Sequence, residues 1–167
     1  KLLRIWSTGC STGEEVYSLA MMLAEYFDQE NVSCEIKIFA TDIDRFSLDQ
    51  ASQGFYPDSI VADIDPLFLV KYFTKHENGY QIRDSIRQMV VFATHNLLKD
   101  PPFSKLDLLV CRNLFIYLKP DVQARILSSF YYSLSPDGFL FMGSSETIGE
   151  MGNAFEVIDS KWKLFRF

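Results

Sequence analysis

The chain has 167 residues and a formal net charge of −6, and 48% of its residues are hydrophobic. This length is sufficient for one domain, residues 1–167, with a core of its own. The sequence contains no apolar run near the length of about 18 residues that predicts a membrane-spanning helix. It also lacks a dense basic run that would predict nucleic acid as a partner.

Three cysteines, Cys10, Cys34 and Cys111, have no C-x-x-C spacing and cannot all pair with one another. We therefore predict neither a metal site nor a disulfide framework, and we expect a reducing, cytoplasmic location. No cleavable signal precedes the first apolar run, LLRIW, and this start is typical of an excised domain.

The first half of the chain predicts the order strand, loop, helix, strand, helix. A strand is expected at about Leu2 to Thr8. A helix with one buried face follows, because apolar residues recur at helical spacing at Val16, Leu19, Ala20, Leu23, Ala24 and Phe27. The run CEIKIFATDID then indicates a second strand that ends in acids, and FSLDQAS predicts a second helix closed by Gly54.

The second half contains three short apolar runs, MVVFAT, LDLLVC and FLFMG, which are typical of buried parallel strands. Between the last two, PDVQARILSSFYYSL predicts a helix, because Pro120 and Asp121 suit a first helical turn, and SPDG predicts a turn back into a strand. This alternation predicts a doubly wound α/β sheet, whose ligands bind at the carboxyl ends of its strands.

Residues 55–89 interrupt the alternation of strands and helices. A short helix is expected around residues 67–72, and KHENGYQIR predicts a hairpin that turns near Asn78 and Gly79. We expect a small subdomain inserted in the main fold.

The segment GCSTG fits two kinds of site. As G-x-S-x-G it matches the turn that presents a nucleophilic Ser11 in hydrolases, which requires an acid and then a histidine later in the chain. His76 falls in the predicted hairpin. His95 follows a strand, but no residues precede the first strand to form an oxyanion loop. Cys10 has no evident activating neighbour. A hydrolase is therefore disfavoured.

As a cofactor loop, the same segment is better suited, because Gly9 and Gly13 let the backbone approach a ligand closely. The following helix opens with Glu14 and Glu15, which repel a pyrophosphate but favour a ligand with an ammonium or sulfonium group, such as S-adenosylmethionine. For one of these carboxylates the alternative is a favourable interaction with the helix dipole alone.

Polar residues stand at the ends of further strands. Asp42 is placed to accept hydrogen bonds from both hydroxyls of a ribose, whereas Asp44 suits a helix cap. Asn96 follows VVFATH, and Arg112 and Asn113 follow LLVC, so four strand ends are expected to meet at one crevice.

The run DPPF, from Asp100 to Phe103, spells a loop with which amino methyltransferases hold a base nitrogen. Here it precedes LDLLVC instead of following its strand. We therefore place it at the opposite edge of the sheet and interpret it as an ordinary turn.

Together the ordered runs WSTGCSTGEEVYSLA, FATDID, NLL, CRNLFIYL and SPDGFLFMGSSE closely resemble the chemotaxis receptor methyltransferases, the CheR family, over nearly the whole chain. The resemblance implies a class I, Rossmann-like methyltransferase sheet that is mostly parallel, with helices on both faces and one antiparallel strand from SKWKLFRF. It also implies an enzyme that transfers a methyl group from S-adenosylmethionine to glutamate side chains on the cytoplasmic helices of chemoreceptors, leaving S-adenosylhomocysteine.

By this resemblance Tyr117 is the catalytic tyrosine, with a buried core aromatic as the alternative. Asn96 and Leu97 are expected near the adenine, and Arg112 and Asn113 at the methyl end. The full set of expected cofactor contacts is Gly9, Glu15, Asp42, Asn96, Leu97, Arg112 and Asn113. A glutamate substrate is already an anion at neutral pH, so the implied reaction needs no general base.

Two features depart from the family. Its N-terminal helical domain, which carries a basic receptor-facing surface, is absent from this sequence. The predicted hairpin is also short for the docking of a receptor tether peptide. A non-catalytic S-adenosylmethionine-binding or interaction module, fused or bound to other signalling domains of a larger bacterial protein, is the alternative function.

Overall fold

The main sheet has seven strands, and the computed structural model describes all residues from 1 to 167. The strand order is β6-β2-β1-β7-β8-β10-β9. The strands are β1 (Leu2–Thr8), β2 (Glu35–Asp42), β6 (Val90–Thr94), β7 (Leu106–Cys111), β8 (Leu134–Met142), β9 (Glu156–Asp159) and β10 (Leu164–Arg166). Every strand predicted for this sheet is present, and β9 is an additional one.

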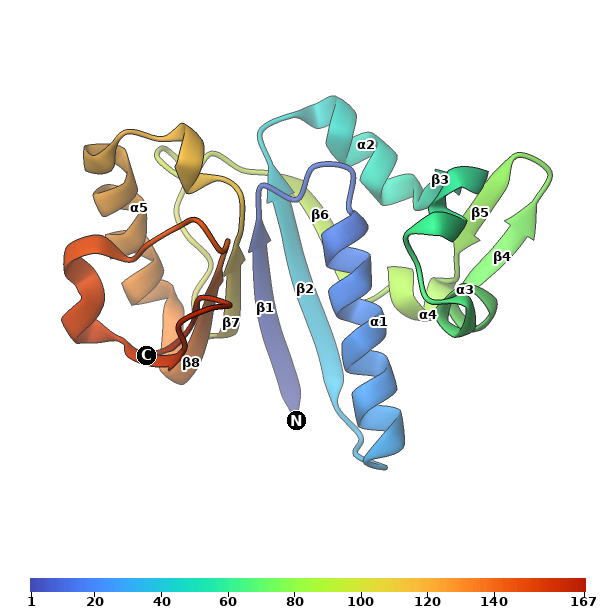
Figure 1. Cartoon of the computed structure of the whole chain (residues 1–167), viewed down its shortest axis with the longest axis horizontal. Helices are drawn as coiled ribbons and strands as arrows, with labels where there is room; N and C mark the ends of the chain where they lie inside the picture. The colour runs from blue at the N-terminus through green and yellow to red at the C-terminus, as the bar shows by residue number, and fades with distance from the viewer.

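The sheet is doubly wound, as expected. β1 pairs in parallel with both β2 and β7, while β10 runs antiparallel to β8 and β9. The antiparallel strand predicted from SKWKLFRF is therefore confirmed. The chain reverses its winding between β1 and β7, and the carboxyl ends of β1 and β2 point to the edge over which α2 lies (Figure 1). In α/β sheets such an edge is where ligands bind.

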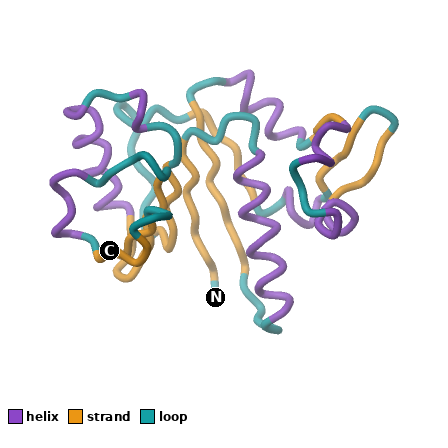
Figure 2. The backbone as a smooth tube through the Cα atoms, viewed as in Figure 1, coloured by secondary structure: helices purple, strands orange, loops and turns teal.

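Two hydrophobic clusters cover the two faces of the sheet. Alternate strand residues contribute to opposite faces, so Ile5 belongs to one cluster and Trp6 to the other. Helices α1 (Glu14–Gln29) and α2 (Arg45–Gln53) cover the first face, and α5 (Pro120–Ser133) covers the second. Figures 1 and 2 show α5 on the far side of the strands from α1.

A second sheet lies beyond α1 (Figure 1), with the strand order β3-β5-β4. Its strands are β3 (Phe55–Pro57), β4 (Phe73–His76) and β5 (Gly79–Ile82); η1 (Asp58–Ala62), α3 (Pro66–Tyr72) and α4 (Asp84–Arg87) accompany them. The predicted hairpin is confirmed, although His76 faces Gly79, so Glu77 and Asn78 form its turn.

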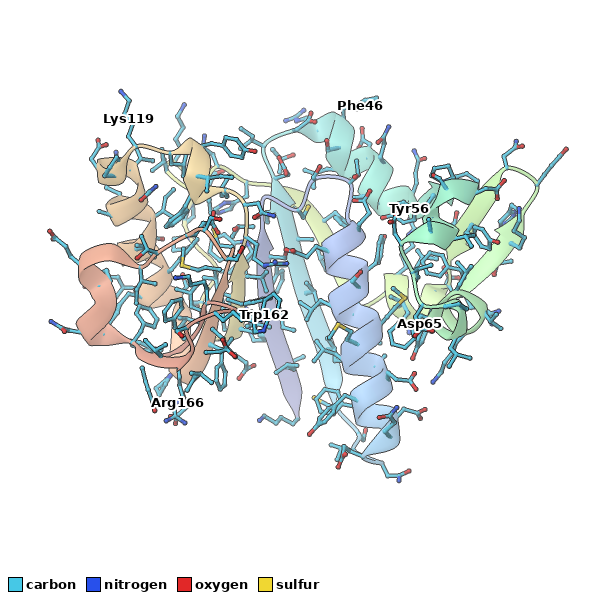
Figure 3. The ribbon with its side chains drawn as sticks, in the orientation of Figure 1. Phe46, Tyr56, Asp65, Lys119, Trp162 and Arg166 are labelled. Atoms are coloured by element: carbon cyan, nitrogen blue, oxygen red, sulfur yellow. The ribbon has the colours of Figure 1, made fainter.

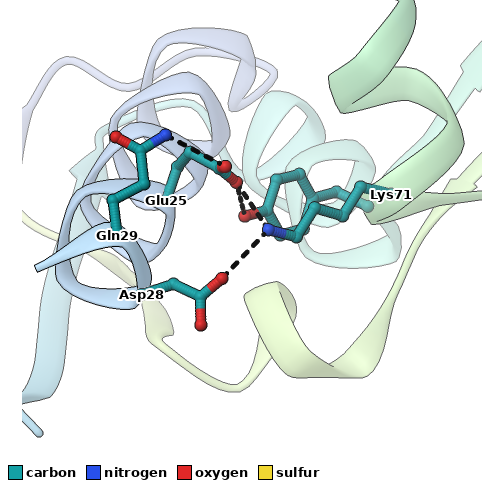
Figure 4. Close-up of polar contacts among 5 residues, drawn as sticks. Glu25, Asp28, Gln29 and Lys71 are labelled. Carbon is teal, nitrogen blue, oxygen red and sulfur yellow. Dashed lines mark hydrogen bonds and ion pairs between the residues drawn. The ribbon is translucent and has the colours of Figure 1, made fainter. Parts of the chain in front are cut away.

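Polar contacts join this small sheet to α1. Lys71 Nζ on α3 lies 2.7 Å from a Glu25 carboxylate oxygen and 3.4 Å from one of Asp28 (Figure 4). Tyr72 Oη also donates to Glu25 at 2.7 Å. The ion pairs are solvent-exposed, so they contribute little to stability. Tyr72 and Phe73 belong to the same buried hydrophobic cluster as the inner face of α1, and this shared burial holds the junction.

The predicted SPDG turn is wrong in one respect, because β8 continues through it. Leu106 pairs with Leu134 and Leu108 with Phe139, so the intervening residues of β8 bulge out of the ladder. Asp137 has a φ of 62°, which is the local irregularity that SPDG signalled. No helix in the structure combines the length and the hydropathy needed to cross a membrane.

Candidate functional site

A cavity of about 330 Å³ opens at the carboxyl ends of the strands. Its volume falls in the range of about 300–1,000 Å³ that is typical of small-molecule sites. Six of the eight predicted site residues line it, namely Gly9, Asp42, Asn96, Leu97, Asn113 and Tyr117. The loops after β1, β2, β6 and β7 thus meet here, as the positions of the motifs predicted. Sequence reasoning did not identify the apolar wall formed by Ile43, Leu98, Leu114, Leu118 and Ile126.

The loop after β1 has a backbone that requires glycine. Gly9 and Gly13 have φ angles of 61° and 91°. A Cβ at Gly13 would lie 3.0 Å from the Ala51 Cβ and 3.2 Å from the Tyr56 hydroxyl, so a side chain there would crowd both neighbours as well as strain the backbone. Tyr56 Oη also donates to the Thr12 carbonyl at 2.8 Å. Tyr56 lies where the small sheet meets α1 and α2 (Figure 3), and it fixes this loop from outside.

Asp42 connects the loop after β1 with the end of β2. One carboxylate oxygen accepts the Ser11 N–H at 2.9 Å, and the other accepts the Asp44 N–H at 3.0 Å. A carboxylate oxygen has more than one acceptor position, so both oxygens can still accept from a ligand. Asp44 caps α2 as predicted, since it accepts from the Ser47 hydroxyl and the Phe46 N–H, and these bonds lower the pKa of its carboxyl group.

Glu15 and Arg112 do not line the cavity. Arg112 Nη1 lies 2.7 Å from a Glu15 carboxylate oxygen. The guanidinium also lies over the Phe141 ring, 4.9 Å from its centroid. This arrangement ties the first turn of α1 to the end of β7. Glu15 retains a second carboxylate oxygen, for which the structure gives no partner among the residues of the chain.

Tyr117 is not a core residue. The residue is 79% exposed and lines the cavity, whereas Phe115, two residues earlier, is 1% exposed and belongs to the buried cluster on the α5 face of the sheet. The interpretation of Tyr117 as a buried aromatic is therefore wrong. Asn113 has a φ of 57°, an unusual conformation for a residue with a side chain, and it begins the loop that carries Tyr117.

The geometry gives no support to a nucleophile at residues 10 and 11. Burial raises the pKa of the Cys10 thiol to about 12. Neither histidine is hydrogen-bonded to Ser11, because His95 Nε2 lies 3.0 Å from the Pro101 carbonyl oxygen and His76 lies in β4 of the small sheet.

The placement predicted for DPPF is wrong at its first residue. Asp100 accepts the N–H of Asn96 at 2.7 Å, so it lies beside the cavity and not at the opposite edge of the sheet. It does not line the cavity. From there the segment crosses the sheet, and Phe103 stacks on Phe39 of β2 with ring centroids 4.6 Å apart. Asp100 therefore shapes the loop that carries Asn96.

Sequence reasoning also missed Glu146, which follows β8. Only 4% of this residue is exposed, and its carboxylate accepts hydrogen bonds from the backbone after β7. The run GSSE contains the residue, but nothing in the sequence indicates which distant backbone it binds.

Over residues 1–164 the sequence matches the family described as "CheR methyltransferase, SAM binding domain". It is 41% identical to an uncharacterised 104.1 kDa protein of Rhodobacter capsulatus, over 98% of this chain and 17% of that protein. It is 36% identical to the chemotaxis protein methyltransferase of Borreliella burgdorferi (96% of this chain, 58% of that protein) and 37% identical to that of Escherichia coli (92% and 55%). The chain thus spans little more than half of the named methyltransferases.

Two solved structures share the fold at low sequence identity. PKMT2 from Rickettsia typhi, in complex with AdoHcy, superposes with a TM-score of 0.52 at 16% identity, over 84% of this chain and 20% of that one. A putative O-methyltransferase from Nostoc punctiforme gives a TM-score of 0.54 at 11% identity, over 84% of this chain and 32% of that one. The fold is therefore the class I, Rossmann-like fold of S-adenosylmethionine-dependent methyltransferases.

Proposed function

Because the chain belongs to the CheR methyltransferase family and comprises its S-adenosylmethionine-binding domain, we propose that it is the catalytic domain of a protein-glutamate O-methyltransferase that acts on chemoreceptors. The observation that carries this proposal is the convergence of six motif residues on one cavity at the carboxyl ends of the strands. The named chemotaxis methyltransferases, which match nearly the whole chain, support the same substrate class.

The residues at the cavity fit S-adenosylmethionine. The glycine loop after β1 lets the backbone approach a ligand closely, and the carboxylate of Asp42 retains acceptor capacity for ribose hydroxyls. The apolar side chains of Leu97 and Leu114 provide a surface for an adenine ring. Acidic groups suit a cationic ligand better than a phosphate.

We assign the residues accordingly. Asp42 holds the ribose, Asn96 and Leu97 contact the adenine, and Gly9 leaves room for the ligand. Glu15, which lies outside the cavity lining, is assigned to the amino acid portion through its second carboxylate oxygen, with Arg112 holding it in place. Asn113 and Tyr117 border the end of the cavity where the methyl group is transferred.

S-adenosylmethionine, when bound, supplies a sulfonium methyl group that a carboxylate can attack directly. The substrate glutamate is ionised at neutral pH, so the chain needs no general base. Its own residues therefore have to align the two reactants and exclude water. We assign the alignment to Tyr117, which lines the cavity and exposes its side chain to an incoming substrate.

The experiment uses a longer protein that contains this chain, a chemoreceptor cytoplasmic fragment and methyl-labelled S-adenosylmethionine. We expect label on glutamate residues as an ester, which mild base releases as methanol. Tyr117→Phe should lower kcat far more than cofactor affinity, because the hydroxyl aligns the reacting atoms. Tyr132→Phe is the matched control, since that side chain is 77% exposed and does not line the cavity.

Label that resists base would contradict O-methylation. Cofactor binding without any transfer to receptors would instead identify the domain as a non-catalytic binding module. This chain covers only 17% of the Rhodobacter relative. We therefore include fusion to further signalling domains in the proposal.

A further inference from the structure

Glu146 is the most deeply buried carboxylate of the protein, with 4% of the residue exposed. None of the ion pairs includes it. Its carboxylate instead accepts four backbone N–H groups. Oε1 accepts from Leu114 at 2.9 Å and Phe115 at 2.7 Å, and Oε2 accepts from Asn113 at 3.2 Å and Gly143 at 2.6 Å.

Three successive N–H groups can point at one carboxylate group only when the backbone turns sharply. The left-handed conformation of Asn113, with a φ of 57°, supplies that turn. Converging amides of this kind form a concave site for an anion. Burial of a carboxylate is strongly unfavourable unless such bonds replace its water, and buried amides likewise need an acceptor. The carboxylate and the loop therefore depend on each other.

The same loop forms one wall of the cavity. Asn113, Leu114 and Tyr117 all line it, and they lie within or directly after the segment that Glu146 binds. The contact is also tightly packed, since a Cβ at Gly143 would lie 2.6 Å from Glu146 Oε2. Glu146 thus joins the end of β8 to the wall of the site without lining the cavity itself.

We propose that Glu146 is a positioning residue, whose buried carboxylate fixes the backbone of residues 113–115 and thereby sets the placement of Asn113 and Tyr117 at the cofactor cavity. This inference rests on the proposed function, because it concerns the same site. The residue that holds the cavity wall after β7 thus comes from the loop after β8. The sequence did not predict this link between the two loops.

The test compares Glu146→Gln and Glu146→Asp with the unmodified chain. A glutamine keeps the shape but offers one acceptor oxygen, so its amide N–H₂ faces two of the four backbone donors. An aspartate keeps the charge but is shorter by one methylene. The matched control is Asp107→Asn, because Asp107 accepts the Arg4 N–H at 2.8 Å near the opposite end of β7.

S-adenosylhomocysteine is the probe, and its affinity is measured by calorimetry well below the unfolding midpoint of each variant. We expect Glu146→Gln to stay folded and to lose roughly 10-fold or more in affinity, as two buried donors lose their acceptor. Glu146→Asp should recover part of the loss, and Asp107→Asn should bind like the unmodified chain. S-adenosylmethionine should lose affinity by the same factor, since the effect acts through the backbone.

Affinity that is unchanged in folded Glu146→Gln would overturn the inference while leaving the proposed function intact. A loss confined to the cationic S-adenosylmethionine would also overturn it, by showing a direct effect of charge. If neither Glu146 variant folds, the residue serves stability alone and the positioning role is wrong. Failure of the unmodified chain to bind either ligand would overturn the proposed function together with this inference.

Discussion

Replacement of Asp42 by alanine tests the assignment of the ribose contact. Its two carboxylate oxygens hold the Ser11 and Asp44 N–H groups at 2.9 and 3.0 Å, and both bonds are solvent-exposed. The freed amides can therefore bind water, so the free energy of unfolding should fall by only about 0.5–1.5 kcal/mol. Cofactor affinity should fall much further.

The size of the affinity loss follows from the bonds that the carboxylate can still make. Hydrogen bonds to a charged group contribute about 1.5–3 kcal/mol, which corresponds to a loss of roughly 10- to 100-fold in affinity. The cofactor affinity of Asp42→Asn should be close to that of the alanine variant. In either orientation of the amide, its N–H₂ group faces the Ser11 N–H or the Asp44 N–H.

The assay is calorimetric titration with S-adenosylhomocysteine, accompanied by urea unfolding of each variant. Asp44→Ala is the control, since Asp44 caps α2 in the same segment but does not line the cavity. That variant should lose stability and bind within about twofold of the unmodified chain. Equal affinity losses in the Asp42 and Asp44 variants, or none in Asp42→Ala, would refute the reasoning.

Three further outcomes are expected. Tyr56→Phe removes the hydroxyl that donates to the Thr12 carbonyl at 2.8 Å, so urea unfolding should show a loss of about 0.5–1.5 kcal/mol and calorimetry a several-fold weaker cofactor affinity. Burial raises the pKa of the Cys10 and Cys111 thiols from 9.0 to about 12. Because the unfolded chain releases these protons at lower pH than the folded chain, the free energy of unfolding should fall as pH rises from 9 towards 12. This fall should be smaller in a Cys10→Ser, Cys111→Ser double variant. The initial methylation rate of this chain, with its charge of −6, should be low on an acidic receptor helix and should rise with ionic strength as repulsion is screened.

Most of the main sheet was predictable because its signals are local. The apolar periodicity of α1 and the apolar run of β1 require only neighbouring residues, and both elements match their predicted positions. The four strand ends at the cavity followed from the rule that parallel strands present their carboxyl ends at one edge. The strand β9 was missed because EVID alternates weakly and pairs only with β10.

The parts that sequence reasoning missed depend on contacts between distant segments. Glu146 binds amides about thirty residues away, as its separation from Asn113 is 33 positions. Tyr56 reaches the Thr12 carbonyl across 44 positions. DPPF was misplaced because the loop between β6 and β7 begins at one edge of the sheet and ends at the other, so order along the chain did not reveal which edge holds Asp100.

The central claim, that the cavity at the strand ends binds the cofactor, is tested most directly by nuclear magnetic resonance titration of the chain with S-adenosylhomocysteine. We predict that the backbone amides of Gly9, Asp42, Asn96 and Asn113 shift together with one saturation curve. A second cavity, of about 220 Å³, lies between α1 and the small sheet and is lined by Met21, Ile60 and other residues. Amide shifts confined to that cavity, or no shifts at all, would contradict the account.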